Sequence, residues 1–97
     1  MEQILKIAAT LNLPVENNYI RLFHGTSKGN QTKIIKQRKF KGFPWFAPDI
    51  ETAQKFSRQA GGVPVVMEVW VNIESLYYNG YFTTKNPIKL VESNKYS

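Results

Sequence analysis

The alternation of apolar and polar residues divides the chain into short helical and extended segments. Residues 2–12 predict a helix because four apolar residues recur there at helical spacing. These residues are Ile4, Leu5, Ala8 and Leu11. Residues 19–24 predict a strand, in which Ile20, Leu22 and His24 share one face. The chain therefore opens with a helix and continues into an extended segment.

Residues suited to helix N-caps predict two further helices. Residues 29–31 predict a loop, and residues 33–39 predict a helix with Thr32 as its N-cap. Residues 50–59 predict another helix with Asp49 as its N-cap. Between them, residues 43–47 predict a strand at a sheet edge, since its proline lacks an N–H group for a central ladder. Ile50, Ala53 and Phe56 are expected on the inward face of the last helix, together with Ala60.

Residues 63–71 form the clearest strand pattern, because β-branched residues alternate there with a second set of side chains. The pattern of residues 72–78 fits both a strand and a loop. Asn79 and Gly80 are typical of a tight turn. The remaining predictions are short strands at residues 81–84 and 88–92 and a frayed tail at residues 93–97.

Together these segments predict one α+β domain with five or six short strands and two or three short helices. Residues 1–18 are the N-terminal helix and lead-in, residues 19–92 the core and residues 93–97 the tail. A chain of 97 residues can hold only one small hydrophobic core.

Composition narrows the possible chemistry. The chain has no cysteine and one histidine, which argues against a disulfide framework, a thiolate nucleophile and a dedicated zinc site. No apolar run approaches the roughly 20 residues of a membrane span, and no signal peptide is visible beside the acidic Glu2. We therefore expect a soluble, cytoplasmic protein without a metal ion.

The net charge of +6 favours anionic partners such as a nucleotide, a nucleic acid or an acidic protein. Six cations follow one another with no acid among them: Lys28, Lys33, Lys36, Arg38, Lys39 and Lys41. Such a run is either a solvated helix face or a contact surface for phosphate groups. Both interpretations remain open from the sequence.

Three motifs recur in a fixed order. The first is residues 22–27, Leu-Phe-His-Gly-Thr-Ser, which is followed by a short helix. The second is residues 44–49, Pro-Trp-Phe-Ala-Pro-Asp, which leads into the helix of residues 50–59. The third is the Val-rich strand that ends in Asn-Ile-Glu, followed by Asn-Pro-Ile-Lys-Leu-Val at residues 86–91.

In this order, the motifs resemble those of the ADP-ribosyltransferase fold in its His-Tyr-acid branch. That branch includes the poly-ADP-ribose polymerase catalytic cores, the rifamycin-modifying transferases and small phage-encoded transferases. The resemblance covers residues 20–92 and implies a split β-sandwich of short strands. It also implies NAD as substrate, cleavage of the ribose–nicotinamide bond and transfer of ADP-ribose to an acceptor.

The resemblance assigns roles to the matching positions. His24 would hydrogen-bond a ribose hydroxyl, and Gly25 would present its backbone N–H and C=O to the nicotinamide carboxamide. Thr26 and Ser27 would add hydroxyl contacts. Trp45 and Phe46 would bind the cofactor, Trp45 at the stacking position where the family usually has tyrosine. The plain structural alternatives are a packed core histidine, an ordinary turn at residues 25–27 and two core aromatics.

The family also places a carboxylate near the nicotinamide ribose, where positive charge develops. Glu74 matches best, because it ends the Val-rich segment. Glu92 and Glu68 are the alternatives, and a domain that keeps this fold without a catalytic acid is a fourth.

We therefore expect a mono-ADP-ribosyltransferase that uses NAD to modify a host protein or another acceptor. The brevity of the chain is typical of a small phage or mobile-element protein that acts on a host cell. The alternative is an inactive module of the same fold that binds a host protein or nucleic acid through its basic face. A related activity, transfer of RNA phosphate to NAD, fits less well because the arginines that it requires are not evident.

Overall fold

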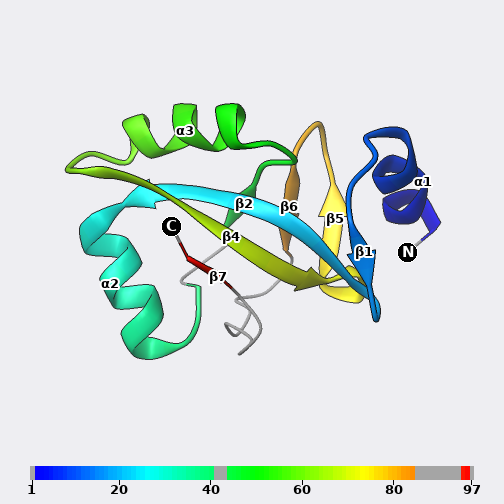
Figure 1. The fold of residues 1–97 in the computed structure, drawn as a ribbon, viewed down its shortest axis with the longest axis horizontal. Helices are drawn as coiled ribbons and strands as arrows, with labels where there is room; N and C mark the ends of the chain where they lie inside the picture. Colours follow the sequence, from blue (N-terminus) through cyan, green and yellow to red (C-terminus); the bar gives the residue numbers. More distant parts are fainter. Residues whose placement is uncertain (1, 41–43, 85–94, 97) are drawn as a thin grey trace.

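The computed structural model describes residues 2–40, 44–84 and 95–96. In this part of the chain, three helices accompany two antiparallel sheets, which confirms the predicted α+β class (Figure 1). The larger sheet has the order β1-β2-β4-β7 and the smaller sheet the order β3-β6-β5. No helix in these residues is both long and apolar enough to cross a lipid bilayer.

The long β2–β4 pair forms the framework of the fold. Strand β2 (Tyr19–Ser27) and strand β4 (Pro64–Asn72) run antiparallel, and their register extends from Tyr19 opposite Asn72 to Ser27 opposite Pro64. Strand β2 extends three residues beyond the predicted end, so His24 lies within the strand rather than at its exit. The β4 prediction is confirmed to within one residue.

The two faces of this pair pack against different layers. Ile20 and Leu22 of β2, with Met67 and Val69 of β4, are fully buried on the face toward the smaller sheet. Phe23 lies on the opposite face and packs with residues of α3 (Ile50–Gln59). The predicted alternation along β2 is thus confirmed, and both faces contribute to a core.

A short hairpin at the start of the larger sheet was not predicted. Strand β1 (Val15–Glu16) pairs with β2 through a two-residue loop, since Glu16 lies opposite Tyr19. The loop residues Asn17 and Asn18 both have positive φ, 49° and 69°. A turn with two left-handed residues matches the twist of the flanking strands, and asparagine tolerates that conformation.

The smaller sheet consists of β3 (Trp45–Phe46), β5 (Leu76–Tyr78) and β6 (Phe82–Thr84). The predicted turn at residues 79–80 connects β5 to β6, and Gly80 has a φ of 77°. The segment with the ambiguous pattern is a 3-10 helix, η1 (Ile73–Ser75), followed by β5. A single bridge, Phe23 to Ala47, connects the two sheets in the described residues.

Helix α3 lies over one face of the β2–β4 pair (Figure 1). Asp49 caps it as predicted, because the carboxylate accepts a hydrogen bond from the Thr52 N–H at 2.8 Å. Ala53 is fully buried, but Ile50 is 50% exposed, contrary to the predicted inward face. Ser57 is buried instead, because the helix turns that side of its surface toward β2.

Helix α2 (Lys28–Gln37) begins five residues earlier than predicted. Its N-cap is Ser27, whose hydroxyl accepts a hydrogen bond from the Asn30 N–H at 3.1 Å. Thr32 is inside the helix, where its hydroxyl donates to the Lys28 carbonyl at 3.0 Å. The strand therefore passes into the helix directly, without the predicted loop.

Helix α1 (Glu2–Thr10) closes the opposite end of the molecule (Figure 1). It buries Ile4 and Ala8, whereas Leu5 and Leu11 of the predicted stripe are 42% and 45% exposed. The buried stripe is narrower than predicted because the helix contacts the core along only one edge.

The prediction of a frayed tail is wrong for two residues. Lys95 and Tyr96 form strand β7, which pairs with Glu68 and Met67 of β4. The backbone of β4 offers an edge on the side away from β2, and the tail residues pair with it. The strand predicted at residues 88–92 lies outside the described residues.

Candidate functional site

His24 is fixed by aromatic neighbours from a distant part of the chain. Its side chain lies on the core-facing side of β2, as predicted. The ring contacts Phe40 edge-on, with 5.1 Å between the centroids, and Phe46 at 5.6 Å. Phe40 and Phe46 also contact each other, so the three rings form one cluster that restricts the imidazole to one orientation.

The hydrogen bond of His24 identifies its tautomer. Nδ1 lies 2.9 Å from the Trp45 carbonyl oxygen, which can only accept, so Nδ1 carries the proton. Burial lowers the pKa of His24 from its ordinary value of 6.5, and the bond to the Trp45 carbonyl opposes that shift. We therefore expect a neutral imidazole at pH 7, with Nε2 left as a hydrogen-bond acceptor.

The same hydrogen bond accompanies a break in the ladder between the two sheets. Phe23 and Ala47 exchange both backbone hydrogen bonds, at 2.8 and 2.7 Å. In a regular antiparallel ladder, Gly25 and Trp45 would form the next such pair. They do not form it, and the Trp45 carbonyl accepts from the His24 ring instead.

Gly25 therefore has unused backbone groups. The alternation of the ladder directs its N–H and C=O away from β4 and toward the split between the sheets. Neither group has a hydrogen-bond partner among the described residues. One residue thus offers a donor and an acceptor side by side, next to the His24 imidazole.

Helix α3 holds Gly25 from the other side. A Cβ atom at this position would be 1.8 Å from the Ala53 carbonyl oxygen and 2.8 Å from the Ser57 nitrogen. Both are backbone atoms of α3, so no side-chain rotation could relieve the overlap. Only glycine allows this contact, and the contact fixes where its free N–H and C=O lie.

Trp45 provides an exposed aromatic surface beside Gly25. Its side chain is 46% exposed and contacts Phe56 of α3, with 5.7 Å between the ring centroids. On its other side it contacts Tyr81 at 4.5 Å. The indole therefore points away from the His24 ring, although its backbone carbonyl holds that ring.

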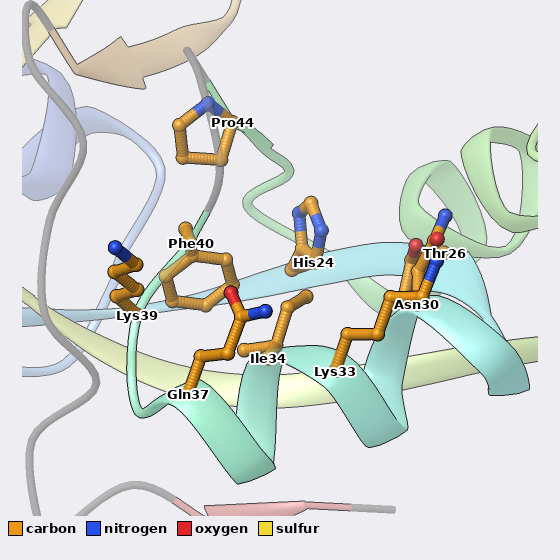
Figure 2. A pocket seen from close by; sticks show the side chains of 9 residues that line it. All are labelled: His24, Thr26, Asn30, Lys33, Ile34, Gln37, Lys39, Phe40 and Pro44. Carbon is orange, nitrogen blue, oxygen red and sulfur yellow. The ribbon is translucent and has the colours of Figure 1, made fainter.

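A cavity of about 530 Å³ opens beside His24 on the α2 side (Figure 2). Its nine described lining residues are His24, Thr26, Asn30, Lys33, Ile34, Gln37, Lys39, Phe40 and Pro44. Two of them are cations and none is acidic, while Thr26, Asn30 and Gln37 supply hydrogen-bonding groups. The cavity therefore suits a polar ligand with negative charge.

The structure brings some of the expected site residues together and separates others. Thr26 lines the cavity with His24. The Ser27 hydroxyl already serves as the cap of α2. Phe46 is fully buried and packs behind His24, so its ring is not exposed to a ligand. Trp45 lies beside Gly25, as described above.

Glu74 and Glu68, two of the three candidate acids, are not among the described residues that line this cavity. Glu74 lies in η1, after the end of β4 that pairs with Tyr19, and Tyr19 is five residues from His24 along β2. Tyr19 and His24 are therefore about 17 Å apart along the strand. Glu68 lies on the α3 side of the sheet, with Oε1 3.7 Å from the Arg21 Nε. Glu92 lies outside the described residues.

Sequence reasoning missed Asn30, Gln37 and Phe40 as lining residues. Asn30, Lys33 and Gln37 recur at a spacing of three and four, which places them on one face of a helix. That signal was obscured because residues 29–31 were assigned to a loop. The position of Phe40 depends on tertiary packing and has no local signal.

A scan against protein-family models, a search of the curated proteins and a search of the solved structures each found no match to this chain.

Proposed function

We propose that the protein binds NAD at the split between the two sheets and transfers ADP-ribose from it to an acceptor. The observation that carries this proposal is the free backbone N–H and C=O of Gly25 beside the neutral His24. A primary carboxamide has one carbonyl acceptor and two N–H donors. It can therefore pair with both groups of Gly25 at once, as the nicotinamide end of NAD requires.

The aromatic residues around Gly25 support the same orientation. A nicotinamide that pairs with Gly25 lies next to the exposed indole of Trp45 and the Phe56 ring on α3. A flat ring that lies against the exposed part of the indole gains apolar contact. Trp45 would then act in place of the tyrosine that the related family uses.

His24 is suited to the adjacent ribose. With its proton held on Nδ1 by the Trp45 carbonyl, Nε2 can accept a hydrogen bond from a ribose hydroxyl. The cavity beyond it would take the rest of the dinucleotide, because Lys33 and Lys39 favour the negative charges of a pyrophosphate. Its volume of about 530 Å³ is within the usual range of small-molecule sites.

In the reaction, the bond between ribose C1′ and the nicotinamide nitrogen breaks, and nicotinamide leaves with the bonding electron pair. A nucleophile of the acceptor forms the new bond to C1′ and gives up its proton. A carboxylate near the ribose would stabilise the positive charge that develops. Glu74, Glu92 and Glu68 are the residues to test for that role.

The test is release of nicotinamide from NAD by the purified protein, with and without host-cell lysate, followed by mass spectrometry of the lysate proteins. We expect release and an adduct of one ADP-ribose on an acceptor. His24→Ala should weaken NAD binding, because the ribose contact is lost. Trp45→Ala should do the same, whereas Leu11→Ala, which removes an equally exposed apolar side chain just after α1, serves as the matched control.

The variants Glu74→Gln, Glu92→Gln and Glu68→Gln assign the acid. The catalytic one should lose release but retain NAD binding, which is measured as an increase in melting temperature. NAD binding without release in the wild type would favour a binding module of the same fold. Absence of both binding and release would reject the NAD proposal.

A further inference from the structure

The acidic and basic residues are unevenly distributed along the molecule. Residues 17–48 contain no Asp or Glu, and this segment includes all of β2 and α2. Glu2, Glu16 and Glu74 belong to α1, β1 and η1, and Figure 1 shows α1 and β1 at the end of the molecule opposite α2. The α2 end therefore carries positive charge without compensation from its own segment.

We define the α2 cationic face as the five exposed cations of this end of the molecule: Lys28, Lys33, Lys36, Arg38 and Lys39. Helix α2 buries only Ile34, and its cations Lys28, Lys33 and Lys36 are exposed to solvent. Lys36 lies roughly 160° around the helix axis from Ile34, which makes it the most outward cation. The described residues contain no salt bridge to any of the five.

Two of these cations occupy positions that do not favour the helix itself. Lys28 is in the first turn, where the helix dipole disfavours positive charge. Arg38 is the C-cap in the left-handed conformation, with a φ of 56°, where glycine or asparagine is usual. Neither side chain packs in the core, so neither position is explained by stability of the fold.

The residue types discriminate between two classes of partner. Protein interfaces are enriched in aromatic residues, methionine and arginine, and depleted in lysine. The α2 cationic face has four lysines, and Ile35 is the only large apolar side chain that α2 exposes. Lysines without an apolar centre are typical of contacts to phosphate groups.

We propose that the α2 cationic face binds the phosphodiester backbone of a nucleic acid. Lys28 and Lys36 are about 12 Å apart along the helix axis, given a rise of about 1.5 Å per residue. One strand of B-form DNA presents three or four phosphates over that length, at about 3.4 Å each. Lys33 and Lys39 also line the cavity beside His24, whereas Lys28 and Lys36 do not, so backbone binding through these last two does not depend on NAD turnover.

The test measures binding of fluorescent oligonucleotides by anisotropy at several NaCl concentrations without NAD. Single-stranded RNA and duplex DNA with equal numbers of phosphates distinguish the two sources of the backbone. On duplex DNA, the plot of log Kobs against log[NaCl] has a negative slope, and each phosphate contact that is removed makes this slope smaller in magnitude by about 0.9. We expect Lys28→Gln/Lys36→Gln to reduce the slope by about 2, and neither residue lines the cavity beside His24.

The matched control is Lys6→Gln/Lys55→Gln, which removes two exposed lysines from α1 and α3. Either pair of substitutions lowers the net charge from +6 to +4. An unchanged slope in the control supports the proposal, and an equal loss in both variants overturns it in favour of general attraction. Absence of binding at low salt, or equally tight binding of polyglutamate, also overturns it.

Discussion

At the scale of single residues, His24 is defined by a few contacts that the sequence does not reveal. Its face of β2 could be predicted, because strand alternation places it with Ile20 and Leu22. Its contacts with Phe40 and Phe46 could not be predicted, because the course of the chain after α2 brings these residues to His24. The consequence is a half-buried imidazole whose pKa is lowered by desolvation.

This pKa shift predicts how stability depends on pH. The unfolded chain takes up a proton on His24 near its ordinary pKa of 6.5, whereas the folded protein does so only at lower pH. The contribution of neutral His24 to the free energy of unfolding is therefore complete above pH 6.5. It is lost as the pH falls from 6.5 through the pKa of His24 in the folded protein. We expect urea midpoints of the wild type to fall from pH 7.5 to pH 5.5.

His24→Gln separates this effect from other titrations. His24 is the only histidine, so the variant contains no side chain with an ordinary pKa in this range. The stability difference between wild type and variant should become smaller toward low pH. A difference that is constant over the whole range would contradict the lowered pKa.

At the scale of elements, Gly25 determines how closely α3 can approach β2. We expect Gly25→Ala to destabilise the protein by about 1–3 kcal/mol or more, because the new methyl group would overlap the α3 backbone at Ala53 and Ser57. Thermal unfolding followed by circular dichroism measures this loss.

Gly29→Ala is the matched control for the same chemical change. Gly29 is inside α2, and a Cβ there has nothing within 4 Å. Replacement by alanine should be neutral or stabilising by about 0.5–1 kcal/mol, since glycine disfavours helix. Equal destabilisation by both substitutions would contradict the proposed packing role of Gly25.

The elements also show which sequence signals were sufficient. Asp49, the Val-rich strand and the turn at residues 79–80 were predicted correctly, because each rests on local chemistry. The β1 hairpin was missed although Asn17 and Asn18 were a signal for a left-handed turn. The start of α2 was missed because Gly29 and Asn30 favour loops, whereas the Ser27 cap and the burial of Ile34 stabilise a helix.

At the scale of the whole molecule, two hydrophobic clusters share one pair of strands. The larger cluster fills the space between the sheets, and the smaller one joins α3 to the outer face of β2 and β4. Neighbouring residues of β2 alternate between them. Because the β2–β4 ladder belongs to both clusters, we expect them to unfold in one transition.

Ile20→Val weakens the larger cluster and Phe23→Leu the smaller one, each by on the order of 1–2 kcal/mol. In urea, tryptophan fluorescence and far-ultraviolet circular dichroism should give the same midpoint for either variant. A midpoint that differs between the two probes would show that the layers unfold separately.

The candidate site was predictable only in part at this scale. The motif around His24 and Gly25 indicated a binding edge, but the break in the ladder depends on where β3 leaves β2. The cavity combines residues from β2, α2 and the segment after it, and their meeting is a property of the fold. The sequence likewise carries no distance between Glu74, which lies in η1 beyond the Tyr19 end of the β2–β4 pair, and His24, which lies five residues further along β2.

The single bridge between the sheets in the described residues also divides the site into one part where substitutions disturb the packing and another where they are better tolerated. Gly25 and His24 belong to the β2–β4 pair, where a substitution disturbs the packing of α3 or the aromatic cluster. Trp45 and Tyr81 belong to the smaller sheet and its loop, where their rings contact each other. Besides the Phe23–Ala47 bridge, Trp45 contacts the other layers at the His24 ring and at Phe56 of α3. The β2–β4 pair can stay unchanged while the exposed side chains of the smaller sheet are replaced. Strand β3 and the loop of residues 79–81 are therefore the places to engineer a new ligand preference.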